Sequence, residues 1–271
     1  MLLCECLDVT RSGFYEWQKS KNCPKKDDSA LKERMSGLFN LSRHTYGWRR
    51  ITFALRQEGI ICNHKKVRCL MKELNLVPKV RKKFKATTNS NHAYPVEPNH
   101  LDRQFTVARP NVAFVGDITY ISTDEGWLYL ATVIDLYSRK VKGWAMGERM
   151  TADLAVSALG MSLNDIENPA EILFHSDRGV QYASKAYKEI LEENKMVQSM
   201  SRKACCWDNA VAESFFGTLK QELVYHCHFK TREEAKSAIF NYIEAFYNRV
   251  RLHSTLGYQT PESVEQAALA A

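Results

Sequence analysis

The most informative stretch of the chain reads Val112-Ala113-Phe114-Val115-Gly116-Asp117-Ile118-Thr119-Tyr120-Ile121. Apolar, aromatic and β-branched residues dominate it, which predicts a largely buried β-strand. One acidic residue, Asp117, interrupts this pattern. A carboxylate inside such a strand is costly unless a cation or hydrogen-bond donors satisfy it. Asp117 is therefore a candidate metal ligand.

Two further strand patterns follow this stretch, and short turn sequences separate all three. We therefore expect a three-stranded antiparallel meander. Helical and strand patterns then alternate, which gives the predicted order βββαβαβα. Thr151 is expected to cap the helix at 151–164, and Asp208 the helix at 208–224. The expected elements after residue 121 are strands at 127–135 and 140–146, a helix at 151–164, a strand at 171–174, a helix at 184–193, a strand at 197–200, and helices at 208–224 and 231–247.

Three short helical patterns precede the strands, at residues 29–41, 48–58 and 63–74, with Asn63 as the expected N-cap of the third. The second and third helices, joined by about four residues, fit a helix-turn-helix. A basic helical bundle that binds no DNA is the alternative. Residues 1–20 are expected to be the end of a longer helical unit. The candidate DNA contacts on and around the helix pair are Arg49, Arg50, Lys65, Lys66 and Arg68.

Charge is distributed unevenly along the 271 residues, whose formal net charge is +7. Residues 1–100 hold 20 Lys and Arg against 9 Asp and Glu, so the whole basic excess lies there. Clustered cations displace the counterions of nucleic-acid phosphates, although a solvated basic surface without a partner is equally compatible. The sequence contains no P-loop signature and no apolar segment long enough to span a membrane, so we expect neither an ATP requirement nor a membrane. Eight cysteines without a CxxC pair favour a reducing cytoplasm.

Two more acidic residues, Asp177 and Glu213, occupy positions that suit metal ligands. Asp177 follows a predicted strand, at the carboxyl edge where sites of α/β proteins gather. Glu213 lies inside a predicted helix, where Lys220 falls on the same face. Hard carboxylates from two strands and a helix suit Mg²⁺ or Mn²⁺, and two such ions about 4 Å apart can promote in-line displacement at phosphorus. Each acid taken alone has a structural alternative, as a hydrogen-bonded turn residue or a solvated charge.

Three motifs surround these acids. They read Gly116-Asp117-Ile118-Thr119-Tyr120-Ile121, His175-Ser176-Asp177-Arg178-Gly179-Val180-Gln181-Tyr182 and Trp207-Asp208-Asn209-Ala210-Val211-Ala212-Glu213-Ser214-Phe215-Phe216-Gly217-Thr218-Leu219-Lys220. In these motifs the chain resembles the OrfB-type DDE transposases of bacterial two-frame insertion sequences, whose catalytic region is similar to retroviral integrases. The 35 residues between Asp177 and Glu213, and Lys220 seven residues after Glu213, match that family's pattern.

The resemblance extends toward both ends of the chain. Tyr46-Gly47-Trp48-Arg49-Arg50-Ile51 resembles the family's helix-turn-helix signature. Phe246-Tyr247-Asn248-Arg249-Val250-Arg251-Leu252-His253-Ser254-Thr255-Leu256-Gly257-Tyr258 resembles its C-terminal signature. Two departures lie beside the predicted site. Phe114 stands where the family usually has Trp, and Ala204-Cys205 where Gly-Asn is common.

The resemblance implies a fold and a domain order. The fold class is α/β, a ribonuclease H-like core with a mixed five-stranded sheet and helices on both faces, preceded by an all-α helix-turn-helix region. The implied parts are a partial helical segment at 1–20, the helix-turn-helix domain at 29–77, a basic linker at 78–107, the catalytic core at 108–228, and a C-terminal helix and tail at 229–271.

The resemblance also implies chemistry. A metal-activated water cuts DNA at an element end, and the freed 3′-hydroxyl then attacks another phosphodiester. Asp117, Asp177 and Glu213 would be the catalytic ligands of two Mg²⁺ or Mn²⁺ ions. Trp127, Trp144, Phe215 and Phe216 are expected in the core. The residues that would hold DNA near the acids are Lys220, Arg178, His175, Asn209, Arg249, Arg251 and His253.

The implied partners are DNA, both element ends and target, further copies of the chain on that DNA, and an upstream-frame protein or frameshift fusion. The implied location is the bacterial cytoplasm, at the nucleoid. Two alternatives stay open at this stage. One is a ribonuclease or junction nuclease that shares the core but uses only water as nucleophile. The other is a catalytically silent DNA-binding protein that regulates transposition.

Overall fold

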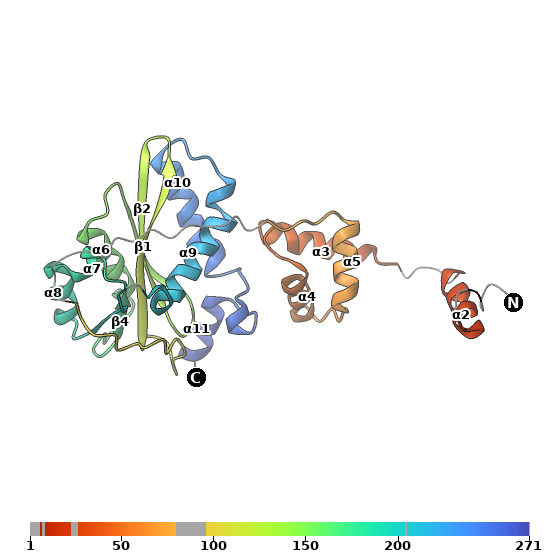
Figure 1. Ribbon diagram of the computed structural model, residues 1–271, viewed down its shortest axis with the longest axis horizontal. Helices are drawn as coiled ribbons and strands as arrows, with labels where there is room; N and C mark the ends of the chain where they lie inside the picture. The colour runs from red at the N-terminus through yellow and green to blue at the C-terminus, as the bar shows by residue number, and fades with distance from the viewer. Residues whose placement is uncertain (1–5, 7–8, 23–26, 80–95, 204, 271) are drawn as a thin grey trace.

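The computed structural model describes residue 6 and residues 9–22, 27–79, 96–203 and 205–270. A domain built around a five-stranded sheet forms the larger part of the chain, and a helical domain precedes it in sequence (Figure 1). Residues 81–85, the most basic part of the predicted linker, and Ala204 lie outside the described residues. Among the described helices, none is long and apolar enough to cross a membrane.

The sheet is mixed, with the strand order β3-β2-β1-β4-β5. Its first three strands form the predicted antiparallel meander, and β4 and β5 continue it in parallel with β1. The β1–β4 pairing is short and extends only from Ala113 to Gly116. The mixed sheet expected from the sequence is thus confirmed. The strands are β1 at Ala113–Thr123, β2 at Gly126–Asp135, β3 at Val141–Gly147, β4 at Leu173–Ser176 and β5 at Val197–Met200.

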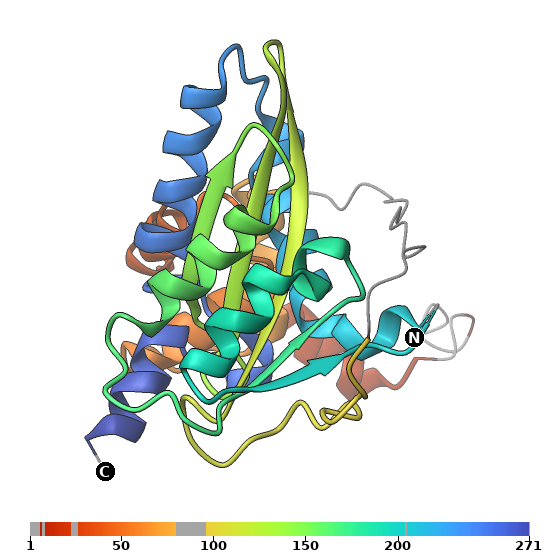
Figure 2. The same cartoon turned by 90° about the vertical axis from the view of Figure 1, so that its left-hand side faces the viewer.

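Helices cover both faces of the sheet (Figure 2). Successive side chains of a strand point to opposite faces, so Phe114 enters one core and Val115 the other. Gly143 of β3 allows α6 to approach closely, because a Cβ there would lie 2.1 Å from the carbonyl oxygen of Ala158. The helices on the Phe114 side are α6 (Ala152–Leu163), α7 (Val180–Ala183) and α8 (Lys185–Glu193), and those on the Val115 side include α9 (Ala210–Glu222) and α10 (Arg232–Phe240).

The N-terminal helices have a core of their own, built around Met35, Ile51, Leu55 and Val67. Asn63 caps α5 as predicted, because its side chain accepts a hydrogen bond from the backbone N–H of Lys65. The helices that share this core are α3 at Ser29–Leu41, α4 at Trp48–Gln57 and α5 at His64–Glu73; α2 at Arg11–Asn22 precedes them, and none of its described residues belongs to the core.

The C-terminal part differs from its prediction. The helix expected at 231–247 becomes π-helical from Asn241 to Tyr247. A further helix, α11 at Pro261–Leu269, occupies part of the segment that the sequence predicted as a tail. Its start signal is present in the sequence, because Thr260 accepts from the backbone N–H of Ser263 and a proline occupies the first turn.

Two other predictions were wrong. Asp208 does not cap α9. It lies in a 3₁₀ turn before the helix, and its buried carboxylate accepts hydrogen bonds from Arg202 and Arg103 instead. Trp127 is not a core residue, because half of its surface is exposed near the tip of the β1–β2 hairpin. The core positions expected for Phe215 and Phe216 are confirmed.

Candidate active site

Two of the three predicted acids lie at the point where β1 and β4 stop pairing. Gly116 and Ser176 form the last pair of these parallel strands. Asp117 and Asp177 are the next residue of each chain segment, so the register brings their backbones side by side. Gly116 itself is required here, since a Cβ would lie 2.4 Å from the Phe174 ring.

The third acid comes from a helix that is tied to the same strand. Glu213 lies in the first turn of α9 and is exposed. Just before this helix, the side-chain amide of buried Asn209 donates a hydrogen bond of 3.3 Å to the carbonyl oxygen of Gly116. The amide oxygen of Asn209 is also buried and has no hydrogen-bond partner among the described residues. Asn209 therefore connects the start of α9 to β1 next to Asp117.

The acids interact electrostatically. Burial raises the pKa of Asp117 well above its usual value, and the charges of Asp177 and Glu213 raise it further. The pKa of Glu213 is also raised, by burial and by the charge of Asp177. Two backbone groups orient the aspartates: the N–H of Ile118 donates to Asp117 at 2.8 Å, and that of Gly179 donates to Asp177 at 2.9 Å. The site is thus a set of like charges that a cation would stabilise.

The three acids interact with one another, but their carboxylates do not converge on a single point. Within the described ranges, no three His, Cys, Asp or Glu side chains are gathered closely enough to hold a metal ion as they stand. Lys220 is the cation that interacts with Asp117. Its side chain is buried, and burial lowers its pKa while the charge of Asp117 opposes that shift.

A network of hydrogen bonds joins the motif at residues 175–182 to the end of β5. His175 is fully buried, with its two ring nitrogens 2.8 Å from the Ser199 hydroxyl and 3.1 Å from the Ser201 hydroxyl. Burial lowers the pKa of His175 to about 4, so its ring is neutral at pH 7. The Arg178 guanidinium donates to the carbonyl oxygen of Ser201 at 2.6 Å. These contacts connect β4 to the end of β5. The His175 ring is bonded to serine hydroxyls of the same chain and does not face solvent.

Asp208 completes this network, and its role was not foreseen from the sequence. Hydrogen bonds from Arg202 and Arg103 hold the pKa of this carboxyl far below its usual range. The Asn99 side chain donates to it as well, at 3.0 Å. The only sequence signal was an acid next to Asn209 in the third motif, which a helix cap explained equally well.

The predicted C-terminal basic residues have different surroundings. Arg251 is buried and donates to both carboxylate oxygens of Glu222, at 2.8 to 3.1 Å. Arg50 of α4 lies 3.9 Å from the same carboxylate. His253 lies 2.8 Å from the Thr255 hydroxyl, and burial lowers its pKa to about 4. Arg249 is exposed and lies 3.3 Å from Glu262. Arg251 and Arg50 thus join the helical domain to the C-terminal part.

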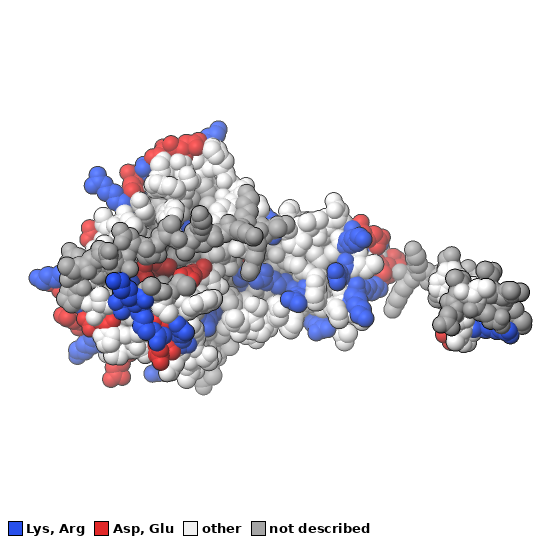
Figure 3. Space-filling model, viewed as in Figure 1, with Lys and Arg blue, Asp and Glu red and all other residues white. Residues whose placement is uncertain are grey.

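The basic residues of α4 and α5 are mostly at the surface, and Lys and Arg gather on the helical domain (Figure 3). Arg49, Lys65 and Arg68 are exposed, whereas Lys66 forms an ion pair with Asp28. A surface hollow of about 490 Å³ lies beside them, and Lys65 and Arg68 both line it.

Two acids where neighbouring parallel strands stop pairing, a third on a packed helix and a preceding helical domain define the integrase class of DNA-processing folds. Sequence comparison agrees. Residues 107–206 and 213–269 match the family described as integrase core domain, and residues 26–84 match the HTH-like domain. One chain of the solved intasome of simian T-cell lymphotropic virus in complex with PP2A regulatory subunit B56 gamma shares the fold. Its TM-score is 0.50 at 17% identity, over 79% of this chain and 70% of that one.

Curated relatives cover almost the full chain. The insertion element IS600 uncharacterized 31 kDa protein of Shigella sonnei is 45% identical over 265 residues, which is 97% of each chain. Transposase InsF for insertion sequence IS3A of Escherichia coli K12 is 41% identical over 276 residues, covering 99% of this chain and 94% of that protein. The chain therefore belongs to the IS3-type family of insertion-sequence transposases with an integrase core. The family, fold class and enzyme class predicted from the sequence are confirmed.

Proposed function

We propose that the protein cuts DNA at the ends of an insertion sequence and joins those ends to target DNA, with Asp117, Asp177 and Glu213 as the catalytic residues. The observation that supports this most is their arrangement. The three carboxylates lie close enough that the charges of Asp177 and Glu213 raise the pKa of Asp117, and the charge of Asp177 raises the pKa of Glu213. A protein keeps such repulsion where it serves a function, because like charges destabilise the fold.

The donor set suits two Mg²⁺ or Mn²⁺ ions. Carboxylate oxygens are the ligands that these hard cations prefer, and the repulsion between the acids would be relieved on binding. The buried amide oxygen of Asn209, which has no hydrogen-bond partner in the part of the chain that the structure describes, adds an acceptor beside Asp117. When bound, the ions would activate the attacking oxygen and stabilise the leaving one. Small side-chain movements of the three acids would be needed, since they are not yet gathered around one point.

The remaining predicted residues divide into two roles. Lys220, Arg49, Lys65, Arg68 and Arg249 would contact DNA, Lys220 near the acids and the other four from the surface. Others act through the protein: His175, Arg178 and Asn209 position the strands that hold the acids, and Arg50, Arg251 and His253 support the junction with the helical domain. Lys66, paired with Asp28, would contribute less to DNA binding.

The biological context is part of the same proposal. A transposase brings two element ends and a target together, so we infer that several copies of the chain assemble on DNA. We also propose that an upstream-frame protein or a frameshift fusion takes part in end recognition. The chain would then act at the nucleoid in the bacterial cytoplasm.

A strand-transfer assay tests the proposal. Full-length protein, alone and as the frameshift fusion, is incubated with labelled oligonucleotides that carry the element ends, with Mn²⁺ present or chelated. Joined products that need the metal and disappear in Glu213→Gln are expected. The matched control is Glu189→Gln, an exposed glutamate on α8. Cleavage without joining would indicate a nuclease, and DNA binding without any nicking would indicate a silent regulator.

A further inference from the structure

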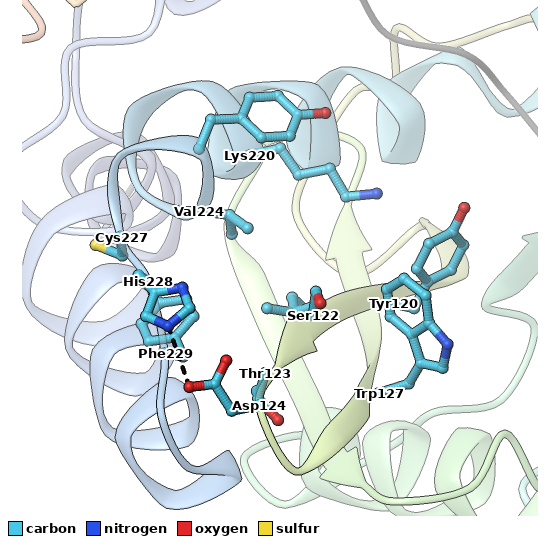
Figure 4. Close-up of a pocket in the computed structure, with 12 residues that line it drawn as sticks. Tyr120, Ser122, Thr123, Asp124, Trp127, Lys220, Val224, Cys227, His228 and Phe229 are labelled. Carbon is cyan, nitrogen blue, oxygen red and sulfur yellow. Dashed lines mark hydrogen bonds and ion pairs between the residues drawn. The ribbon is translucent and has the colours of Figure 1, made fainter.

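A surface pocket lies beside the acids, between the outer part of the β1–β2 hairpin and residues 224–229, which follow α9 (Figure 4). Its volume is about 300 Å³, near the lower end for pockets that take small planar molecules. The pocket follows β1 beyond Gly116, the last residue that pairs with β4. Its lining on β1 begins at Tyr120, three residues beyond Asp117, and continues away from the acids toward the tip of the hairpin.

One wall of the pocket is aromatic and open to solvent. Tyr120 has 37% of its surface exposed and Trp127 has 50%. Their ring centroids are 4.9 Å apart, and the ring planes are inclined by 80°. Single exposed aromatic residues are ordinary, but two adjacent ones that line a hollow offer stacking surface to a planar ligand.

Lys220 connects this wall to the acids. Its ammonium lies 5.0 Å from the centroid of the Tyr120 ring and also interacts with the charge of Asp117. A cation over the ring fixes the orientation of Tyr120. A ligand against these rings would thus be held next to the residues proposed to cut and join DNA.

Lys220 lines the pocket from α9, but a carboxylate lines it as well, and that carboxylate disfavours a phosphate in its part of the pocket. Asp124 lies on the side opposite the two rings, where its carboxylate is 3.1 Å from the His228 ring nitrogen (Figure 4). A phosphate in this space would meet that carboxylate, whereas an uncharged base would not. The exposed Ser122 projects into the same space and offers a hydroxyl to the edge of a base (Figure 4).

We propose that this pocket binds an unpaired nucleobase of the DNA strand that the acids process, an inference that rests on the proposed function. Tyr120 follows Asp117 by three residues, a distance of about 10 Å along the strand. The base would therefore come from within roughly three positions of the phosphate at the acids, since bases in a duplex are about 3.4 Å apart. A base taken out of the duplex loses its stacking partners, and Trp127 and Tyr120 replace them.

Fluorescence of 2-aminopurine tests this assignment in the full-length chain. The probes are two DNA duplexes with chelator present, one with a single unpaired 2-aminopurine near the 3′-end and one fully paired. We expect the wild type to quench the unpaired probe by stacking. Trp127→Ala should abolish the quenching and weaken binding of the unpaired duplex about tenfold, while the paired duplex binds as before. Trp127→Phe, which keeps a ring, should retain most of the quenching.

Phe240→Ala on α10 is the matched control, because Phe240 is also 50% exposed but lies outside the pocket. It should quench like the wild type, and circular dichroism should show all variants folded. The inference is overturned if the wild type binds neither duplex or fails to quench. It is also overturned if Trp127→Ala binds and quenches like the wild type. Quenching without joined products in Mn²⁺ would overturn the proposed function alone, and joined products without quenching would overturn the pocket alone.

Discussion

The three acids around the junction of β1 and β4, and the arginines Arg50 and Arg251, each bring like charges together from distant parts of the sequence, yet the fold treats the two groups in opposite ways. Arg251 and Arg50 share a counter-charge, Glu222, and the Arg251 pair is buried. The charges of Asp177 and Glu213 raise the pKa of Asp117, and the charge of Asp177 raises that of Glu213, with Lys220 as the nearby cation. The arginines with a shared counter-charge stabilise the structure, whereas the three acids that repel one another indicate a site for a cationic ligand.

The largest effect is expected on stability, when the ion pair between Arg251 and Glu222 is broken. Arg251→Met keeps the side chain's bulk but leaves the Glu222 carboxylate buried without its main partner. We expect the free energy of unfolding, measured in urea, to fall by about 3–5 kcal/mol. Arg251→Met combined with Glu222→Met should recover most of the loss. Lys236→Met, which removes an exposed pair with Glu233, should change stability by less than about 1 kcal/mol. Equal losses in Arg251→Met and Lys236→Met would contradict the comparison.

The repelling cluster should respond in the opposite sense. Asp117→Asn removes a charge that its neighbours disfavour, so the melting temperature should rise. Strand transfer should fall by more than about a hundredfold, since even residues that only support metal ligands cost ten- to a hundredfold. Calorimetry and the joining assay measure the two changes on one preparation. A variant that is both less stable and fully active would show that Asp117 is an ordinary core polar residue.

The same carboxylate predicts a pH dependence. The pKa of Asp117 is raised in the folded protein from an ordinary value of 3.8, so the folded state binds the proton more tightly. Its contribution to stability is complete below pH 3.8 and is lost as the pH rises through the raised pKa. The difference in melting temperature between Asp117→Asn and the wild type should therefore grow with pH above 3.8 and shrink when Mn²⁺ is added. A constant difference would show that the pKa is not raised.

The smallest effect concerns exposed cations. Lys65→Gln should leave the melting temperature unchanged and weaken DNA binding only a few-fold. The slope of log affinity against log salt should decrease in magnitude by about one, as for the loss of one phosphate contact. Lys236→Gln on α10 serves as the exposed control outside the helical domain. An unchanged slope would remove Lys65 from the DNA interface.

Much of the fold could be predicted because the signals are local. Asp117 is conspicuous in an apolar strand, and the meander and Asn63 cap follow from short sequence patterns. The surroundings of charged residues could not be predicted in the same way. Arg251 meets a carboxylate from α9, and Asp208 meets a guanidinium from residue 103, so each partner depends on tertiary packing. Trp127 looked like a core residue because its neighbours are apolar, but it lies near the tip of a hairpin where the core has ended.

The contact between the helical domain and residues 250–258 has a consequence for synthesis on the ribosome. The Tyr46 hydroxyl donates to the carbonyl oxygen of Val250 and accepts from the backbone N–H of Leu252. Leu252 is buried in the core of the helical domain, and Tyr258 packs against that core. The helical domain, which is made before the sheet, therefore cannot bury its whole core until residue 258 has been made. Translation that stops earlier would leave this domain without the two side chains that complete its core.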